Sequence, residues 1–229
     1  MRTIRIVAIA AFVMAGLGAS LAQAQKQEAA KKPTPPMEII KTSTAKVQKI
    51  LSNPDLKGEE KQEKRRKQIR KAVSEHFDWR ALARRSLGRH WRNRTEAEQK
   101  EFTALFRELL AKTYIKRIEK QADADISYEG QKIEEEYASV KAVARTKDDR
   151  KIPIEYRLHK VKRQDKEKKD EEKKGEAPKK PKMVWLIYDV KIEGVSLVNN
   201  YRSQFNNIVI GQSYESLVKK LRAKVEDDD

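Results

Sequence analysis

The chain has 229 residues, with 52 Lys and Arg against 35 Asp and Glu, and no cysteine. The absence of cysteine excludes disulfides and thiol chemistry, so the fold depends on an apolar core. The net charge of +17 favours an anionic partner, such as a nucleic acid, an acidic lipid surface or an acidic protein. Charges of opposite sign alternate within residues 57–71, as on a solvated helix face, so the charge alone identifies no partner.

The N-terminus has the features of a secretory signal peptide. The basic residues Arg2 and Arg5 precede an apolar run, which ends in the cleavage-site pattern AQA at residues 22–24. This pattern predicts removal of residues 1–24. An uncleaved membrane anchor is the alternative, but the run is at the short end of the roughly 17–25 residues that a spanning helix needs. Export favours acidic lipids or proteins over nucleic acid, and the proline-bearing residues 25–36 are expected to form a disordered leader.

Helical periodicity dominates the first half of the domain, which is expected to span residues 37–225. Apolar residues recur at helical spacing in 37–52, and again in the more highly charged segment 59–76. Asp78 is a candidate N-cap for a short helix that Gly88 is expected to end.

The strongest helix signal begins at Thr95. Glu98 stands three residues later and completes the pattern of a capping box. The apolar stripe of this helix comprises Phe102, Leu105, Phe106, Leu109, Thr113 and, after a slight drift, Ile118.

From about residue 125 the apolar period changes from helical to two, which predicts strands. The segments with this alternation are 124–133, 137–146, 151–161 and 183–193. Pro153 lacks a donor N–H and therefore favours an edge or an irregular start for the third strand. Helices, an antiparallel meander of about four strands and further helices predict an α+β domain with helices packed on one sheet face.

Two charged segments interrupt or follow this pattern. Residues 162–182 are almost entirely charged and cannot pack a core, so they are expected to form a flexible insertion between the last two strands. Their functional alternative is a tether to an anionic membrane or partner. Residues 226–229 are expected to form an acidic tail.

No residue set has the pattern of a catalytic or metal site. His76, His90 and His159 are isolated in the sequence, and no cysteine supplements them. No nucleophile elbow and no glycine-rich phosphate loop occur. Asp189 and Glu193 are four apart on a strand and could form an acid/base pair, but strand-end carboxylates more often hold a turn or a cation. We therefore predict no catalytic residue, no metal and no cofactor.

Two motifs resemble the MlaC / toluene-tolerance auxiliary family over roughly residues 40–225. The first is "WLIYDVKIEGVSLVNNYRSQF", matched at Trp185, Tyr188, Asp189, Val190, Glu193, Gly194, Ser196, Leu197, Asn200, Tyr201, Arg202, Gln204 and Phe205. The second, upstream, is matched at Leu82, Leu87, Gly88, Trp91, Thr95, Gln99, Phe102, Phe106, Leu109, Leu110 and Tyr114. The lysine-rich leader and the insertion depart from the family pattern and put the usual partner-docking surface in doubt.

The resemblance implies an NTF2-like fold whose sheet and helices enclose an apolar cavity for phospholipid acyl chains, with the head group outside. It also implies a periplasmic carrier that maintains outer-membrane lipid asymmetry, with phospholipid as cargo. The implied partners are an outer-membrane lipoprotein–porin complex and an inner-membrane ABC transporter with an MCE-domain subunit. In this interpretation Gly194 allows a sharp turn, Ser196 caps the next helix, and the helix from Leu197 forms a cavity wall.

The alternation of the strands and the apolar stripe of the helix from Thr95 select most of the candidate lipid-contact residues, and the resemblance adds Leu197, Tyr201 and Phe205 on the wall helix. A filled core remains the alternative for the same side chains, and an NTF2-like enzyme or a polyanion-binding module remain alternative functions. A one-residue error in strand register would reverse the face of every strand residue. The candidates are Phe102, Phe106, Leu109, Val140, Ala142, Ile154, Tyr156, Leu158, Leu186, Tyr188, Val190, Leu197, Tyr201 and Phe205.

Overall fold

The computed structural model describes residues 34–163 and 182–226. The expected signal peptide, most of the leader, most of the charged insertion and the last three residues therefore lie outside the described residues. Contacts divide the chain into two units, and the larger comprises residues 34–161 and 184–229. This larger unit contains all of the described helices and most of the sheet.

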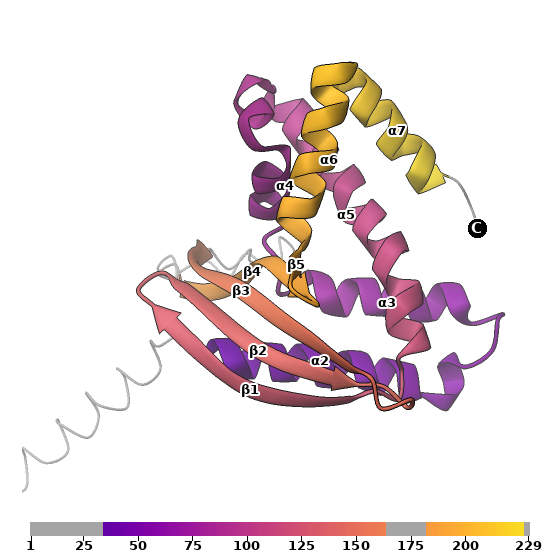
Figure 1. Cartoon of the computed structure of the whole chain (residues 1–229). Helices are drawn as coiled ribbons and strands as arrows, with labels where there is room; N and C mark the ends of the chain where they lie inside the picture. The colour runs from indigo at the N-terminus through magenta and orange to yellow at the C-terminus, as the bar shows by residue number, and fades with distance from the viewer. Residues whose placement is uncertain (1–33, 164–181, 227–229) are drawn as a thin grey trace, which may run out of the picture. The chain divides into compact units, whose positions relative to one another are not determined.

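The order of elements in the described residues is helices, then a sheet, then helices (Figure 1), as the sequence predicts. The helices are α2 (Pro36–Ser52), η1 (Pro54–Leu56), α3 (Gln62–Ser74), α4 (Trp79–Leu87), η2 (Gly88–Asn93), α5 (Glu96–Lys120), α6 (Leu197–Gly211) and α7 (Tyr214–Glu226). The strands are β1 (Asp125–Glu134), β2 (Tyr137–Arg145), β3 (Lys151–Arg163), β4 (Lys182–Ile192) and β5 (Val195–Ser196). Helix α2 includes the buried Pro36, which the sequence assigned to the leader.

Side-chain caps fix where two of the helices begin, and both were predicted. The Asp78 carboxylate accepts a hydrogen bond from the Ala81 N–H at 2.8 Å and caps α4. Thr95 and Glu98 form the reciprocal bonds of a capping box at the start of α5. Helix α4 ends at Leu87, and Gly88 follows as its C-cap with a φ of 60°, a conformation that favours glycine.

The sheet has five strands in the order β1-β2-β3-β4-β5, one more than expected, because the two-residue β5 follows the turn after β4. Glu193 and Gly194 have φ of 52° and 82°, so this turn needs left-handed backbone, as expected for Gly194. Ser196 then caps α6 by accepting a bond from the Asn199 N–H at 3.1 Å. Both predictions for this turn are confirmed.

The prediction of which β4 side chains face the core is wrong for the first half of the strand. The sequence placed Leu186 and Tyr188 on the core face, whereas the structure buries Trp185 and Ile187 there. Tyr188 lies on the opposite face, with its ring centroid 4.2 Å from the Arg85 guanidinium. The consecutive residues Asp189 and Val190 are both buried, so the alternation shifts by one residue at this point. Apolar residues occupy both faces of this strand, and a period of two therefore could not identify the inner face.

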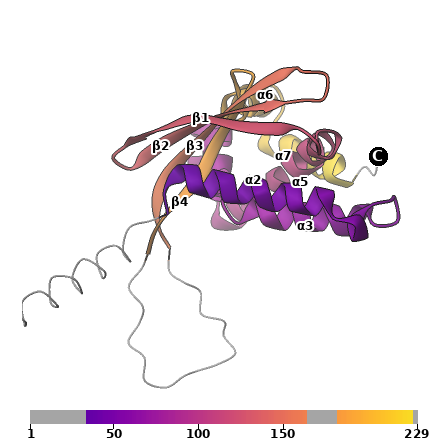
Figure 2. The same ribbon diagram turned by 90° about the horizontal axis from the view of Figure 1, so that it is seen from below.

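Buried side chains form two separate clusters in the described residues. One lies among α4, α5, α6 and α7 and contains closely packed rings, such as those of Phe102 and Phe205 with centroids 5.5 Å apart. The other joins the sheet to the start of α2 and to Leu197 at the start of α6. Helix α3 runs beside α2 (Figure 2). Helix α5 packs against α7, and its Tyr114 packs against both clusters, so this helix takes part in both.

Candidate functional site

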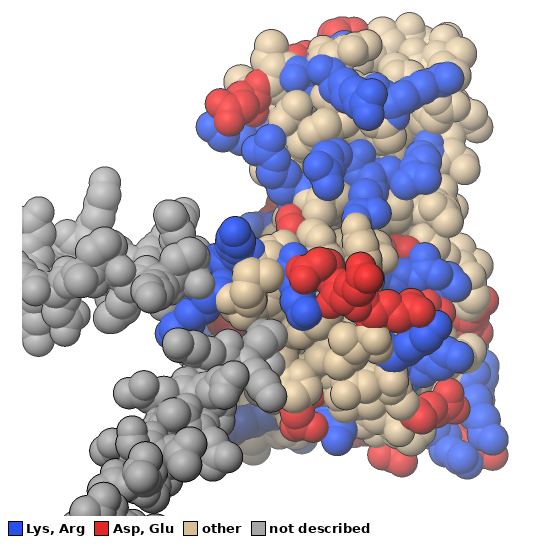
Figure 3. All heavy atoms as spheres, turned by 90° about the vertical axis from the view of Figure 1, so that its left-hand side faces the viewer, with Lys and Arg blue, Asp and Glu red and all other residues tan. Residues whose placement is uncertain are grey.

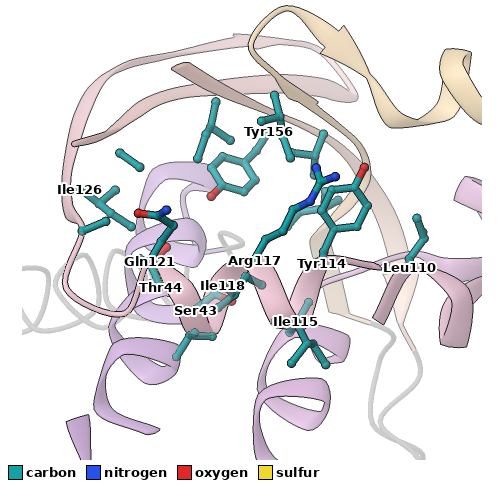
Figure 4. A pocket seen from close by; sticks show the side chains of 18 of the residues that line it. Ser43, Thr44, Leu110, Tyr114, Ile115, Arg117, Ile118, Gln121, Ile126 and Tyr156 are labelled. Atoms are coloured by element: carbon teal, nitrogen blue, oxygen red, sulfur yellow. The ribbon is translucent and has the colours of Figure 1, made fainter. Parts of the chain in front are cut away.

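An apolar pocket of about 550 Å³ lies between the sheet and helices α2, α3 and α5. Its walls come from segments far apart in the sequence, and β1 to β4 contribute the sheet side. Figure 4 shows side chains from opposite walls facing one another across the hollow. The apolar lining includes Ile40, Val47, Leu51, Val73, Leu110, Ile115, Ile118, Ile126, Ala144, Ile152, Ile154, Ile187, Val190, Ile192 and Leu197.

Four of the fourteen candidate lipid-contact residues line this pocket, namely Ile154, Tyr156, Val190 and Leu197. Three more, Val140, Ala142 and Leu158, are on the same face of the sheet but are almost fully buried. Leu186 and Tyr188 are on the other side of β4. The remaining five pack in the helical cluster: Phe102, Phe106, Leu109, Tyr201 and Phe205. Whether any of the fourteen contacts lipid stays a prediction, and only the four are placed at the pocket.

The predicted lipid-contact residues include none from α2 and none from α5 beyond Leu109, although both segments line the pocket. The 25 residues of α5 extend for roughly 37 Å at 1.5 Å per residue, which allows one helix to serve two packing regions. Its first half carries Phe102 and Phe106 into the helical cluster, and its second half carries Tyr114 and Ile118 to the pocket. The drift of the apolar stripe toward Ile118 was the signal in the sequence.

Tyr156 introduces a neutral polar group into the apolar lining. Its side chain points into the pocket (Figure 4). Burial raises the pKa of Tyr156 to about 12, although a hydrogen bond with Thr44 opposes the rise. The hydroxyl is therefore protonated at neutral pH and adds no charge to the pocket.

Charged side chains on the lining are mostly exposed and mostly basic. Arg107, Arg117, Lys120 and Arg150 are exposed cations on the lining, and Glu193 is the one acidic lining residue among those described. Exposed lining residues mark the solvent side of the pocket. A ligand would thus meet cations at the surface and aliphatic side chains inside.

The candidate acid/base pair does not form such a site. The Asp189 carboxylate is buried and accepts hydrogen bonds from the Ser196 hydroxyl at 2.7 Å and from the Val198 N–H at 3.1 Å. Arg157 stands 3.7 Å from the same carboxylate, whereas Glu193 is exposed in the turn. Asp189 thus holds the turn, as the sequence favoured. Across residues 34–163 and 182–226, no three His, Asp or Glu side chains are grouped to hold a metal ion.

No helix in the described part of the chain combines the length and the apolar character needed to cross a membrane.

The fold and the pocket define a class: an α+β protein whose helices and antiparallel sheet surround an apolar, solvent-open pocket. A family model described as "MlaC protein" matches residues 41–169 and 178–223, and the chain belongs to the MlaC family. The resemblance seen in the sequence is confirmed. The structure is similar to that of a phospholipid-binding protein from Ralstonia solanacearum in complex with a phospholipid. That similarity has a TM-score of 0.65 and 19% identity, and it covers 82% of this chain and 95% of the other. No curated protein sequence matches significantly.

Proposed function

We propose that this protein is a periplasmic phospholipid carrier that holds acyl chains in the pocket between α5 and the sheet. The observation that carries the proposal is the apolar pocket of about 550 Å³, which lies within the roughly 300–1,000 Å³ typical of small-molecule sites. Membership of the MlaC family and the phospholipid in the similar Ralstonia structure support a lipid as the occupant.

The energetics of lipid transfer require such a pocket. Moving an acyl chain of about fifteen methylenes into water costs roughly 12 kcal/mol, at about 0.8 kcal/mol per methylene. A carrier must bury the chain to a comparable extent, or the lipid remains in its membrane. Aliphatic side chains from four helices and four strands provide that environment.

The basic surface suits encounters with anionic membranes or acidic partners through long-range attraction. Figure 3 shows Lys and Arg gathered on the face where α4 lies. Helices α4 and η2 carry the exposed Arg84, Arg89 and Arg92. The proposed route runs between an outer-membrane lipoprotein–porin complex and an inner-membrane MCE-domain/ABC transporter complex.

The pocket does not favour the enzyme alternative. An NTF2-like enzyme would need an ionisable group deep in the pocket, such as a carboxyl with a raised pKa. Among the described residues, the acidic lining residue Glu193 is exposed, and the inward hydroxyl of Tyr156 has its pKa raised to about 12. We therefore assign the pocket to binding.

The proposal is tested by loading the protein from vesicles. Lipid-stripped protein is incubated with vesicles of phosphatidylethanolamine and phosphatidylglycerol, repurified, extracted with organic solvent and analysed by mass spectrometry. We expect phospholipid to be recovered with the protein. Protein that stays empty contradicts the carrier, and steeply salt-dependent binding to DNA by empty protein would support the polyanion-binding alternative.

A further inference from the structure

The cations around the pocket differ in whether they are neutralised. Arg70 and Arg107 line the pocket and both lie beside Glu108, with N–O distances of 3.9 and 3.3 Å. Arg117 and Lys120 also line it, three residues apart on α5. Neither of these two forms an ion pair with any residue that the structure describes. Arg150, in the turn between β2 and β3, is a third lining cation with no ion pair among the described residues. The positive charge available to a ligand therefore comes from the C-terminal end of α5 and from Arg150.

The Arg117 side chain is directed toward the pocket wall. Its guanidinium lies 5.5 Å from the centroid of the Tyr114 ring, one turn back along α5, and Figure 4 shows the two side chains together at the hollow. Tyr201 is close to Tyr114 on the adjoining helix. Burial raises the pKa of both phenols, and the charge of Arg117 opposes the rise in each case. Arg117 thus lies beside the protonated side chain of Tyr114 on the lining of an apolar pocket.

A simpler role for Arg117 is to complement the negative end of the helix dipole, since it is in the last turn of α5. That role accounts for a positive charge at this position. It does not account for the direction of the side chain, which turns back over Tyr114. Within the described part of the chain, the Arg117 guanidinium donates to no carbonyl group. Its planar fork of N–H donors is left available, and this geometry matches a phosphate group.

We propose that Arg117 binds the phosphate of a lipid head group at the pocket opening, with the Tyr114 hydroxyl as a second donor and Lys120 adding to the local positive potential. This inference rests on the proposed function and narrows it. Apolar burial selects any lipid with suitable chains, whereas a phosphate contact selects phosphate-bearing lipids over neutral lipids with identical chains. It also gives the head group a defined contact, although the family resemblance implies only that it remains outside.

Competitive loading separates the head-group contact from chain burial. Vesicles of phosphatidylglycerol containing diacylglycerol with identical chains are offered to lipid-stripped protein. The ratio of the two bound lipids is normalised to the vesicle composition. Wild-type protein should be enriched in phosphatidylglycerol. Arg117→Gln should lower this enrichment about tenfold, the effect of losing a charge-assisted hydrogen bond. Because the readout is a ratio of two lipids, it does not depend on the total amount of lipid bound. Arg117→Lys should give an intermediate ratio because it keeps the charge and loses the fork.

The control is Lys220→Gln, which removes an exposed cation of α7 outside the pocket lining and should leave the ratio at the wild-type value. An Arg117→Gln ratio equal to wild type overturns the phosphate contact. If wild-type protein takes up neither lipid, the proposed function itself fails.

Calorimetric titration of inorganic phosphate into lipid-loaded wild-type protein distinguishes a lipid phosphate from free inorganic phosphate as the ligand of Arg117. No binding heat is expected, because the lipid phosphate occupies the site. Heat that disappears in Arg117→Gln would show that the site takes the free anion beside the lipid, which also overturns the proposal.

Discussion

The Asp189 carboxylate accepts a hydrogen bond from the Ser196 hydroxyl at 2.7 Å, across the turn that joins β4 to α6. The same carboxylate accepts from the Val198 N–H, and Ser196 in turn caps α6. One buried acid thus fixes the strand end, the turn and the first turn of the helix. Leu197, between the two bonded residues, is held against the pocket.

Removing this carboxylate should destabilise the fold. Asp189→Ala leaves the Ser196 hydroxyl and the Val198 N–H without their acceptor in a buried site, and we expect a loss of about 2–3 kcal/mol in the free energy of unfolding. Ser196→Ala removes the cap and one of the two hydrogen bonds to the Asp189 carboxylate but leaves the bond from the Val198 N–H, so it should cost less, about 1–2 kcal/mol. Urea denaturation followed by circular dichroism measures both. Equal stability of Asp189→Ala and wild type would show that the turn is held by other contacts.

The cap of α4 makes a contribution to stability that depends on pH. Burial tends to raise the pKa of Asp78, but hydrogen bonds from His159 and from the Ala81 N–H outweigh it, so the pKa of this carboxyl lies below its ordinary value. The folded state therefore binds the proton less readily than the unfolded state. The stabilisation is present above the unfolded pKa and is lost as pH falls through the lower folded pKa.

Asp78→Ala should accordingly lower the free energy of unfolding by about 1 kcal/mol at pH 7, with the difference from wild type shrinking below about pH 4. Urea denaturation across this pH range provides the measurement. A difference that stays constant, or grows on acidification, would contradict the assignment of the charged cap.

Glu119 joins the two helices that form one side of the pocket. Its carboxylate forms ion pairs with the Nε atoms of Arg65 at 2.8 Å and of Arg66 at 3.0 Å, and its side chain is only 13% exposed. Glu119→Gln leaves two half-buried arginines without their carboxylate, and we expect a loss of about 1–3 kcal/mol in the free energy of unfolding.

A surface pair provides the control for Glu119. Glu75 is 42% exposed and pairs with Lys46 at 2.7 Å. Glu75→Gln should cost less than about 1 kcal/mol, because water and salt screen an exposed pair. If the two variants lose equal stability, the α3–α5 bridge has no special role in the structure.

Local signals predicted most of the fold. Asp78, Thr95 with Glu98, and Ser196 act through hydrogen bonds to residues within three positions, so their patterns could be recognised in the sequence. The strands were similarly predicted from alternation, and the inward face was assigned correctly for the pocket residues Ala144 on β2 and Ile154 and Tyr156 on β3. These features depend little on the rest of the molecule.

The site was less predictable because a wall of a pocket and a wall of a core have the same residue types. Phe106 and Ile118 belong to the same helix but have different surroundings. Helix α7 packs against the first half of α5, whereas the sheet lies beside its second half, and the sequence of α5 shows neither contact. Leu186 was misplaced because β4 is apolar on both faces. Arg117 was missed because an arginine near a helix end has an ordinary explanation in the sequence.

Two alanines on the same face of β2 test the central claim that the pocket holds acyl chains. Ala144 lines the pocket and is 8% exposed, whereas Ala138, six residues earlier and 7% exposed, packs in the filled cluster opposite Leu158. In Ala144→Phe the ring can occupy space that the chain would use. In Ala138→Phe it has no such space and should cost about 1–3 kcal/mol of stability.

The decisive measurement is the amount of phospholipid extracted per folded protein, determined by quantitative mass spectrometry for wild type and both variants, with thermal unfolding measured in parallel. We predict that Ala144→Phe remains folded and loses most of its lipid, while Ala138→Phe is less stable and keeps its lipid per folded molecule. An Ala144→Phe protein that carries as much phospholipid as wild type would contradict the account.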